Sequence, residues 1–70
     1  MKKQIAILGS TGSIGTQALQ VIAEHSDLYE AYALTAHNQV DLLIEQARRF
    51  MPEAVVIANP DKYARLKDAL

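Results

Sequence analysis

The feature that most constrains this chain is a set of three glycines with the spacing G-x-x-G-x-x-G, at Gly9, Gly12 and Gly15. They directly follow the apolar residues 5–8, which are typical of a strand, and they open a pattern typical of a helix. A strand that enters a glycine-rich turn, with a helix starting inside it, forms a pocket for a diphosphate. Backbone N–H groups and the positive end of the helix dipole then face the ligand. The alternative interpretation is a Gly/Ser-rich turn that binds no ligand.

Each glycine has an expected role. Gly9 ends the strand where the chain turns tightly, and Gly12 lies where a pyrophosphate would approach the backbone most closely. Gly15 lets the helix pack closely on the sheet. The residues that we expect to line the turn and to offer hydroxyl and N–H donors to phosphate oxygens are Ser10, Thr11 and Ser13.

Strand and helix patterns alternate three times along the chain. The predicted strands are residues 4–8, 30–35 and 54–58, and the predicted helices cover residues 13–25, residues 40–50 and a segment that starts at Asn59-Pro60. Strands and helices that alternate at this spacing indicate right-handed crossovers and a parallel sheet. We therefore predict an α/β protein with a Rossmann-type three-layer half-fold, β-α-β-α-β-α, and the strand order 3-2-1.

Apolar periodicity predicts which face each helix buries. The expected stripes are Ile14, Ala18, Val21 and Ile22 in the first helix, Val40, Leu43, Ile44, Ala47 and Phe50 in the second, and Tyr63, Leu66 and Leu70 in the third. Asn38 is the expected N-cap of the second helix. The strand at residues 54–58 is continuously apolar, which is typical of a strand buried on both faces.

Length and composition limit the domain organisation and the partners. Three strands in this order are half of a dinucleotide-binding fold, so we expect residues 1–70 to form an incomplete N-terminal domain whose first strand has an open edge. We also expect the isolated polypeptide to be marginally stable or to pair through residues 5–8. The net charge of −1 suggests no nucleic-acid partner. The chain shows no leader and no apolar segment near the ~20 residues that span a membrane, so we expect a soluble cytoplasmic protein without a membrane partner.

The end of the second strand bears on the choice of cofactor. In NAD-binding folds an acidic residue about 20 residues past the glycines binds the ribose 2′-hydroxyl, but Thr35 and Ala36 occupy this position. Without an acid, a 2′-phosphate is permitted, and Asn38, Gln39 and the N–H groups of the second helix could receive it. His37 could stack on adenine or donate to the phosphate; the alternative is a solvated turn histidine.

Three stretches resemble the 1-deoxy-D-xylulose 5-phosphate reductoisomerase family: I-L-G-S-T-G-S-I-G-T-Q-A-L at residues 7–19, A-L-T-A at residues 33–36, and Q-A-R-R-F-M-P at residues 46–52. The resemblance covers essentially the whole chain. It implies a soluble, homodimeric enzyme that depends on NADPH and on a divalent metal, Mg²⁺ or Mn²⁺. Such an enzyme rearranges and reduces 1-deoxy-D-xylulose 5-phosphate to 2-C-methyl-D-erythritol 4-phosphate in non-mevalonate isoprenoid biosynthesis.

Carried over by position, the resemblance assigns cofactor contacts and no catalytic residue. The implied contacts are Thr11, Gly12, Ser13 and Ile14 with the diphosphate, and His37, Asn38 and Gln39 with the 2′-phosphate. The second turn often reads Gly-Lys-Asn in the family, so a lysine contact is lost here. The family's metal ligands and phosphosugar-binding residues lie beyond residue 70, and we expect the isolated segment to be inactive.

Two other functional hypotheses stay open at this point. One is a stand-alone NAD(P)-binding module without catalysis. The other is a different reductase with the same glycine spacing, such as an extended short-chain dehydrogenase or a semialdehyde dehydrogenase. The string L-G-S-T-G-S-I-G argues against the different reductase. Only the sequence that follows Leu70 distinguishes the module from the reductoisomerase.

Overall fold

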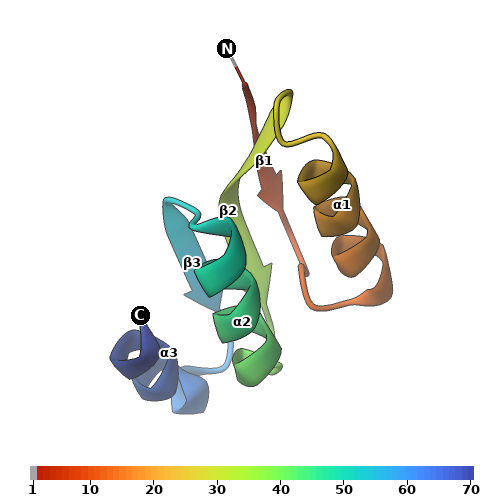
Figure 1. Ribbon diagram of the computed structural model, residues 1–70. Helices are drawn as coiled ribbons and strands as arrows, with labels where there is room; N and C mark the ends of the chain where they lie inside the picture. Colours follow the sequence, from red (N-terminus) through yellow and green to blue (C-terminus); the bar gives the residue numbers. More distant parts are fainter. Residues whose placement is uncertain (1) are drawn as a thin grey trace.

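Strands and helices alternate along residues 2–70, the part of the chain that the computed structural model describes (Figure 1). The elements are β1 (Lys3–Ile7), α1 (Ser13–Glu24), β2 (Tyr29–Ala36), α2 (Val40–Phe50), β3 (Ala54–Ile57), the 3-10 helix η1 (Pro60–Lys62) and α3 (Tyr63–Ala69). The predicted α/β alternation is confirmed. Each predicted strand and helix is present, with bounds shifted by at most one residue and with the third helix divided into η1 and α3.

The three strands form one parallel sheet with β2 in the centre. β2 pairs with β1 on one side and with β3 on the other, in the order β1-β2-β3; read from β3, the same neighbours give 3-2-1. Because all strands run in the same direction, the turns after β1, β2 and β3 lie together at the carboxyl-terminal edge of the sheet, where the three strands end (Figure 1). This edge carries both segments that the sequence singles out as cofactor contacts.

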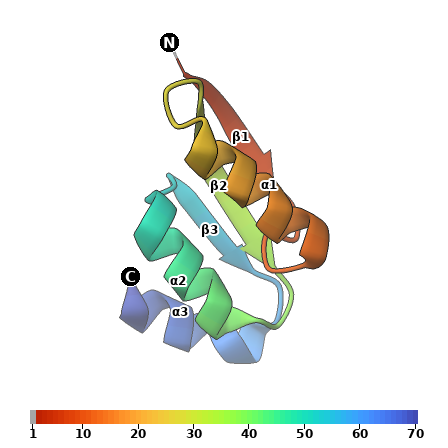
Figure 2. The same ribbon diagram turned by 45° about the vertical axis from the view of Figure 1, so that its right-hand side comes forward.

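Helices α1 and α2 lie on the same side of the sheet, and α3 packs beside α2 (Figure 2). The core between sheet and helices consists of Ile7, Leu19, Ile22, Ala31, Leu34, Ala36, Val40, Leu43, Ile44, Ile57 and Leu66. Leu34 at the centre of β2 and Leu43 of α2 are both 0% exposed. The stripe predicted for the second helix is confirmed from Val40 to Ala47, and Phe50 is half-buried.

The opposite side of the sheet is not covered by residues 2–70. Val56 of β3 is 52% exposed and Tyr32 of β2 is also exposed, while the alternate residue Ile57 is buried. The prediction that the third strand is buried on both faces is therefore wrong for this chain, because only one layer of helices packs on the sheet here.

A bulge in β2 keeps its apolar residues on the covered side. Ile5 pairs with Ala31 and the next residue of β1, Ala6, pairs with Ala33, so Tyr32 is an extra residue in β2. The extra residue shifts the alternation of side chains by one position. Ala31 and Leu34 are therefore both buried, although they are three residues apart.

Two predicted helix faces are wrong in part. In α1 the buried residues are Gly15, Leu19 and Ile22, whereas Ile14 is 84% exposed and Val21 is exposed. The reason is that α1 packs onto the turn through Gly15, which turns Ile14 and Val21 outward. In α3 only Leu66 is buried, while Tyr63 and Leu70 are exposed.

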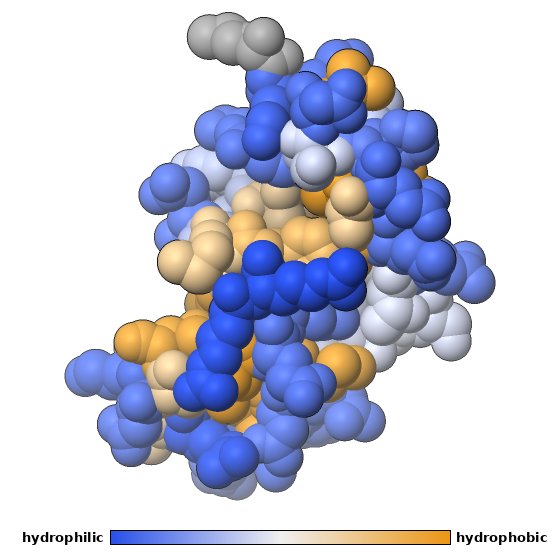
Figure 3. Space-filling view, in the orientation of Figure 1, coloured by the Kyte–Doolittle hydropathy of each residue, from blue (hydrophilic) through white to orange (hydrophobic). Residues whose placement is uncertain are grey.

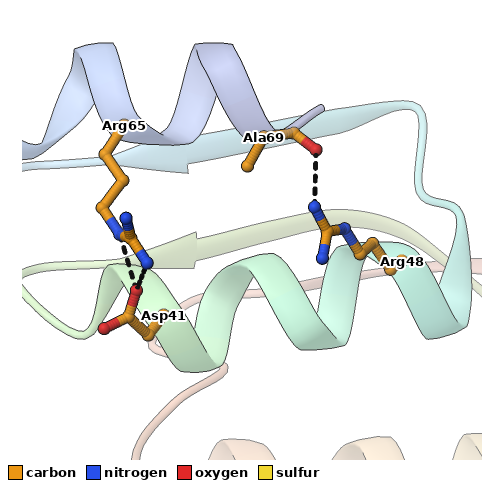
Figure 4. Close-up of polar contacts among 4 residues, drawn as sticks. All are labelled: Asp41, Arg48, Arg65 and Ala69. Atoms are coloured by element: carbon orange, nitrogen blue, oxygen red, sulfur yellow. Dashed lines mark hydrogen bonds and ion pairs between the residues drawn. The ribbon is translucent and has the colours of Figure 1, made fainter.

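The orientation of α3 follows from two polar contacts with α2 (Figure 4). Arg65 forms an ion pair with Asp41, and the Nη2 atom of Arg48 donates to the carbonyl oxygen of Ala69 over 3.2 Å. Residues 65, 66 and 69 therefore face α2, and residues 63 and 70 lie to one side. Exposed ion pairs of this kind contribute only about 0.2–1 kcal/mol, and Leu66 is the residue of α3 that is buried against the core.

The caps of the helices differ from one another. The side-chain oxygen of Asn59 accepts a hydrogen bond from the backbone N–H of Asp61 over 2.9 Å, so the predicted start at Asn59-Pro60 is confirmed. The predicted N-cap of α2 is wrong, because Gln39 occupies this position and makes no side-chain cap. The Oδ1 atom of Asn38 instead accepts from Asn59 Nδ2 over 2.7 Å.

The helix-covered side has a shallow groove between α1 and α2. Figure 3 shows hydrophobic surface in this region, and the groove of about 460 Å³ is lined in part by Leu19, Leu42 and Phe50. Among residues 2–70, every helix is too short or too polar to cross a bilayer.

Candidate functional site

The turn between β1 and α1 depends on glycine at two positions for its own geometry. Gly9 has a φ of +77°, in the left-handed region that side chains with a Cβ rarely adopt. A Cβ at Gly15 would lie 2.2 Å from the carbonyl oxygen of Gly9 and 2.6 Å from the Cα of Ser10. The close approach that Gly15 permits is therefore between α1 and the turn itself, and not with the sheet as predicted.

Gly12 has no such requirement. Its φ of −79° and ψ of 174° suit any residue, and a Cβ there would meet only the carbonyl oxygen of Gly9, at an ordinary 3.5 Å. Neither the backbone conformation nor the packing of this chain demands glycine at this position. A ligand that lies directly against the backbone would demand it.

The N-terminus of α1 is available to an anion. Gly12 is the N-cap and has no side chain to satisfy the first N–H groups, and the first turn contains no acidic residue. The first intrahelical bond runs from the Thr16 N–H to the Gly12 carbonyl over 2.9 Å. The N–H groups of Ser13, Ile14 and Gly15 therefore have no acceptor within the helix, and they point towards the end where the helix dipole is positive.

Three of the four predicted diphosphate contacts lie around one hollow. Gly12, Ser13 and Ile14 line an open cavity of about 460 Å³, together with Leu8, which directly follows β1. All four are exposed. The fourth predicted contact, Thr11, is half-buried in the turn and does not line the cavity.

Ser10 does not face the cavity, so the prediction that it lines the turn for a phosphate is wrong. Its side chain is 0% exposed, and its Oγ donates to Gln46 Oε1 over 2.8 Å. The Gln46 Nε2 donates back to the Ser10 carbonyl oxygen over 2.8 Å. Ser10 therefore holds the turn in place.

Thr35 joins the glycine turn to the end of β2. Its Oγ1 accepts from the Gly9 N–H over 3.0 Å, and its carbonyl oxygen accepts from the Ser10 N–H over 2.8 Å. The sequence drew attention to Thr35 only as a position without a carboxylate. The hydrogen bonds that Thr35 forms with Gly9 and Ser10 join residues 26 and 25 positions apart, which no local sequence pattern indicates.

The second predicted contact segment follows β2 at the same edge. His37, Asn38 and Gln39 are all exposed. The carbonyl of His37 accepts from the Asn59 N–H over 3.0 Å, and the Asn59 side chain holds that of Asn38. Asn59, which the sequence identified only as a cap, also fixes this turn.

The electrostatics of this edge favour anions, although only moderately. The two turns, residues 8–12 and 37–39, contain neither acidic residues nor Lys or Arg. The N-termini of α1 and α2 open from these turns, and neither has a side-chain cap. The first turn of α2 carries Asp41, whose charge is paired with that of Arg65. Two uncapped helix N-termini at one sheet edge can receive two separate phosphate groups. Residues 2–70 contain no cluster of three His, Asp or Glu side chains that could hold a metal ion.

A family model described as 1-deoxy-D-xylulose 5-phosphate reductoisomerase matches residues 5–70 of the chain. A reductoisomerase of this name from Phocaeicola vulgatus is 83% identical over 70 residues, which are 100% of this chain and 18% of that protein. One from Porphyromonas gingivalis is 63% identical over the same length and share. The chain thus spans less than a fifth of the length of these relatives.

Solved structures give the same result. The Zymomonas mobilis reductoisomerase in complex with NADPH matches with a TM-score of 0.95 and 40% identity, over 100% of this chain and 18% of that one. A DOX-P reductoisomerase in complex with NADPH, fosmidomycin and magnesium matches with a TM-score of 0.88 and 41% identity, over 94% and 16%. These matches favour the reductoisomerase hypothesis over the stand-alone module and over a different reductase.

Proposed function

Because the chain belongs to the 1-deoxy-D-xylulose 5-phosphate reductoisomerase family, we propose that it supplies NADPH-binding residues to an enzyme with this activity. The full enzyme converts 1-deoxy-D-xylulose 5-phosphate to 2-C-methyl-D-erythritol 4-phosphate. The observation that carries the proposal is Gly12, a glycine with an ordinary backbone conformation and free space around it, at the uncapped start of α1. Bound NADPH would supply the hydride for the reduction.

The diphosphate is held by the segment Thr11, Gly12, Ser13 and Ile14. In this proposal the N–H groups at the start of α1 donate to its oxygens, and the missing side chain at Gly12 lets the diphosphate approach the backbone. The Ser13 hydroxyl is exposed and adds a further donor. Ile14 contributes its N–H group, while its exposed side chain offers apolar contact to a part of the cofactor that is not charged.

The 2′-phosphate is held by His37, Asn38 and Gln39. The end of β2 carries Thr35 and Ala36 where a carboxylate would bind a 2′-hydroxyl and repel a 2′-phosphate. Thr35 Oγ1 already accepts from the Gly9 N–H. Since the turn has no Lys or Arg, neutral donors and the N-terminus of α2 provide the contacts.

Residues 1–70 are, in this proposal, the incomplete N-terminal part of the NADPH-binding domain. The rest of that domain and the catalytic domain lie elsewhere in the protein, with the ligands of a divalent metal, Mg²⁺ or Mn²⁺, and the residues that bind the phosphosugar. On the basis of the family resemblance and the composition, we also propose that the full-length protein is a cytoplasmic homodimer. It has no nucleic-acid or membrane partner in this proposal. Light scattering of the full-length protein tests the dimer, and cell fractionation tests the location.

The decisive experiment is Gly12→Val in the full-length protein, with NADPH binding measured by fluorescence titration. A Cβ at Gly12 meets only the Gly9 carbonyl oxygen, at 3.5 Å, whereas a branched side chain occupies the place of the diphosphate. We therefore expect NADPH binding to be lost while the protein without cofactor stays folded, with its unfolding temperature lowered only by the weaker N-cap. Ala64→Val on the exposed side of α3 is the control. Unchanged NADPH affinity in Gly12→Val would remove the turn from the site.

A further inference from the structure

A buried hydrogen-bonded pair connects the glycine turn to α2. Ser10 and Gln46 lie 36 positions apart in the sequence, and each donates to the other: Ser10 Oγ to Gln46 Oε1 and Gln46 Nε2 to the Ser10 carbonyl, both over 2.8 Å. Within residues 2–70 they are the two buried polar side chains, at 0% and 7% exposure. A primary amide is well suited to this contact, because it carries a donor and an acceptor side by side.

All polar groups of Ser10 have partners as a result. Its N–H donates to the carbonyl of Thr35, its carbonyl accepts from Gln46, and its hydroxyl donates to Gln46. The Cα of Ser10 is also one of the atoms against which Gly15 packs α1. The backbone of Ser10 is therefore fixed by β2, by α2 and by the first turn of α1 at once.

We propose that Gln46 is a positioning residue for the diphosphate-binding turn. The proposal deepens the proposed function and rests on it. Through its amide, Gln46 sets the position of the Ser10 backbone relative to α2, and hence the direction in which the N–H groups after Gly12 point. The same helix begins next to residues 37–39, so Gln46 also links the two ends at which the cofactor is held.

A purely structural role for Gln46 makes a different prediction. Loss of the pair would then lower the stability of the protein and leave the NADPH affinity of the folded molecules unchanged. A positioning role predicts weaker NADPH binding at temperatures where the protein is fully folded. It also predicts that NADH binding weakens by the same factor, because the two cofactors share the diphosphate.

The test is Gln46→Met in the full-length protein, since methionine has a similar length and no amide. We expect the KM and Kd for NADPH to rise about tenfold. This change corresponds to about 1.4 kcal/mol of binding free energy, which is the size of the contribution of one buried hydrogen bond. We expect kcat and the KM for the sugar phosphate to stay within about twofold. Gln20→Met on the exposed side of α1 is the matched control and should change neither constant.

A double-mutant cycle with Ser10→Ala identifies the pair. Alone, Ser10→Ala weakens NADPH binding less than Gln46→Met does, because the bond from Gln46 Nε2 to the backbone carbonyl stays. Added to Gln46→Met, it has little further effect. An unchanged NADPH Kd in Gln46→Met, while Gly12→Val abolishes binding, overturns the positioning role alone. If Gly12→Val also binds NADPH normally, the proposed function itself fails.

Discussion

Each of the three glycine residues of the motif is a glycine for a different physical reason. Gly9 adopts a positive φ, Gly15 leaves room for the backbone of the turn, and Gly12 is free of both constraints. A sequence pattern cannot separate these reasons, because it records only the absence of a side chain. The separation matters, since it identifies Gly12 as the position that a ligand would require.

Comparing Gly15→Ala with Gly12→Ala tests this separation. We expect Gly15→Ala to lower the free energy of unfolding by about 1–3 kcal/mol or more, because its Cβ would overlap backbone atoms that cannot rotate away. Gly12→Ala should leave stability within about 1 kcal/mol, because the lower entropy of the unfolded chain offsets the weaker N-cap that alanine provides. Urea unfolding of both full-length variants without cofactor measures the difference. Equal losses of stability would contradict the assignment.

The choice of cofactor is also decided by single residues. We expect the full-length protein to bind NADPH more tightly than NADH. We further expect His37→Asp to weaken NADPH binding about tenfold or more, because a carboxylate repels the 2′-phosphate at short range. NADH affinity should change little in the same variant. Calorimetric titration with both cofactors measures the ratio, with His25→Asp at the far end of α1 as the control. Equal affinities of the parent protein for both cofactors would refute the preference.

At the scale of elements, periodicity predicted the strands and helices well but not how each helix is turned. The stripe of α2 is confirmed at four of its five predicted positions, which are buried, while Phe50 is half-buried. In α1 the sequence favoured Ile14 and Val21, although the smaller Gly15 decides which side packs against the turn. Hydrophobicity carries no information on where the backbone of a helix can approach the backbone of a turn. The burial of Ser10 and Gln46 could not be predicted either, because both side chains are polar and hydrophobicity predicts that polar side chains are exposed.

The packing of α2 on β2 is the main link between the helices and the sheet. We expect Leu43→Ala to lower the free energy of unfolding by about 2–5 kcal/mol, because the side chain is completely buried and its loss leaves a cavity. Leu28→Ala, at an exposed position before β2, should cost less than about 1 kcal/mol. Chemical denaturation of the two full-length variants tests this contrast. A similar loss in both would show that α2 does not carry the core.

At the scale of the whole molecule, residues 2–70 leave both edges and one face of the sheet open, because β1 and β3 each pair only with β2. Within this part of the chain Leu8, Tyr32 and Val56 are exposed apolar side chains. An unpaired apolar strand edge tends to pair with another chain. A domain of this size also buries only about 60% of its unfolded surface. Open edge and small core together make the isolated polypeptide of residues 1–70 either marginally stable or self-associating.

Analytical ultracentrifugation and thermal unfolding of that polypeptide test the expectation. If it associates through residues 5–8, Ala6→Lys should shift it towards the monomer, because a lysine on the uncovered face of β1 would place like charges together in the paired state. Ala64→Lys adds the same charge on α3, away from the edge, and should leave the association unchanged.

The polypeptide should show no NADPH oxidation with 1-deoxy-D-xylulose 5-phosphate above a control without protein. A monomer that unfolds above ~60 °C, in the upper range of mesophilic domains, would contradict the expectation, since the open edge would then cost the fold nothing.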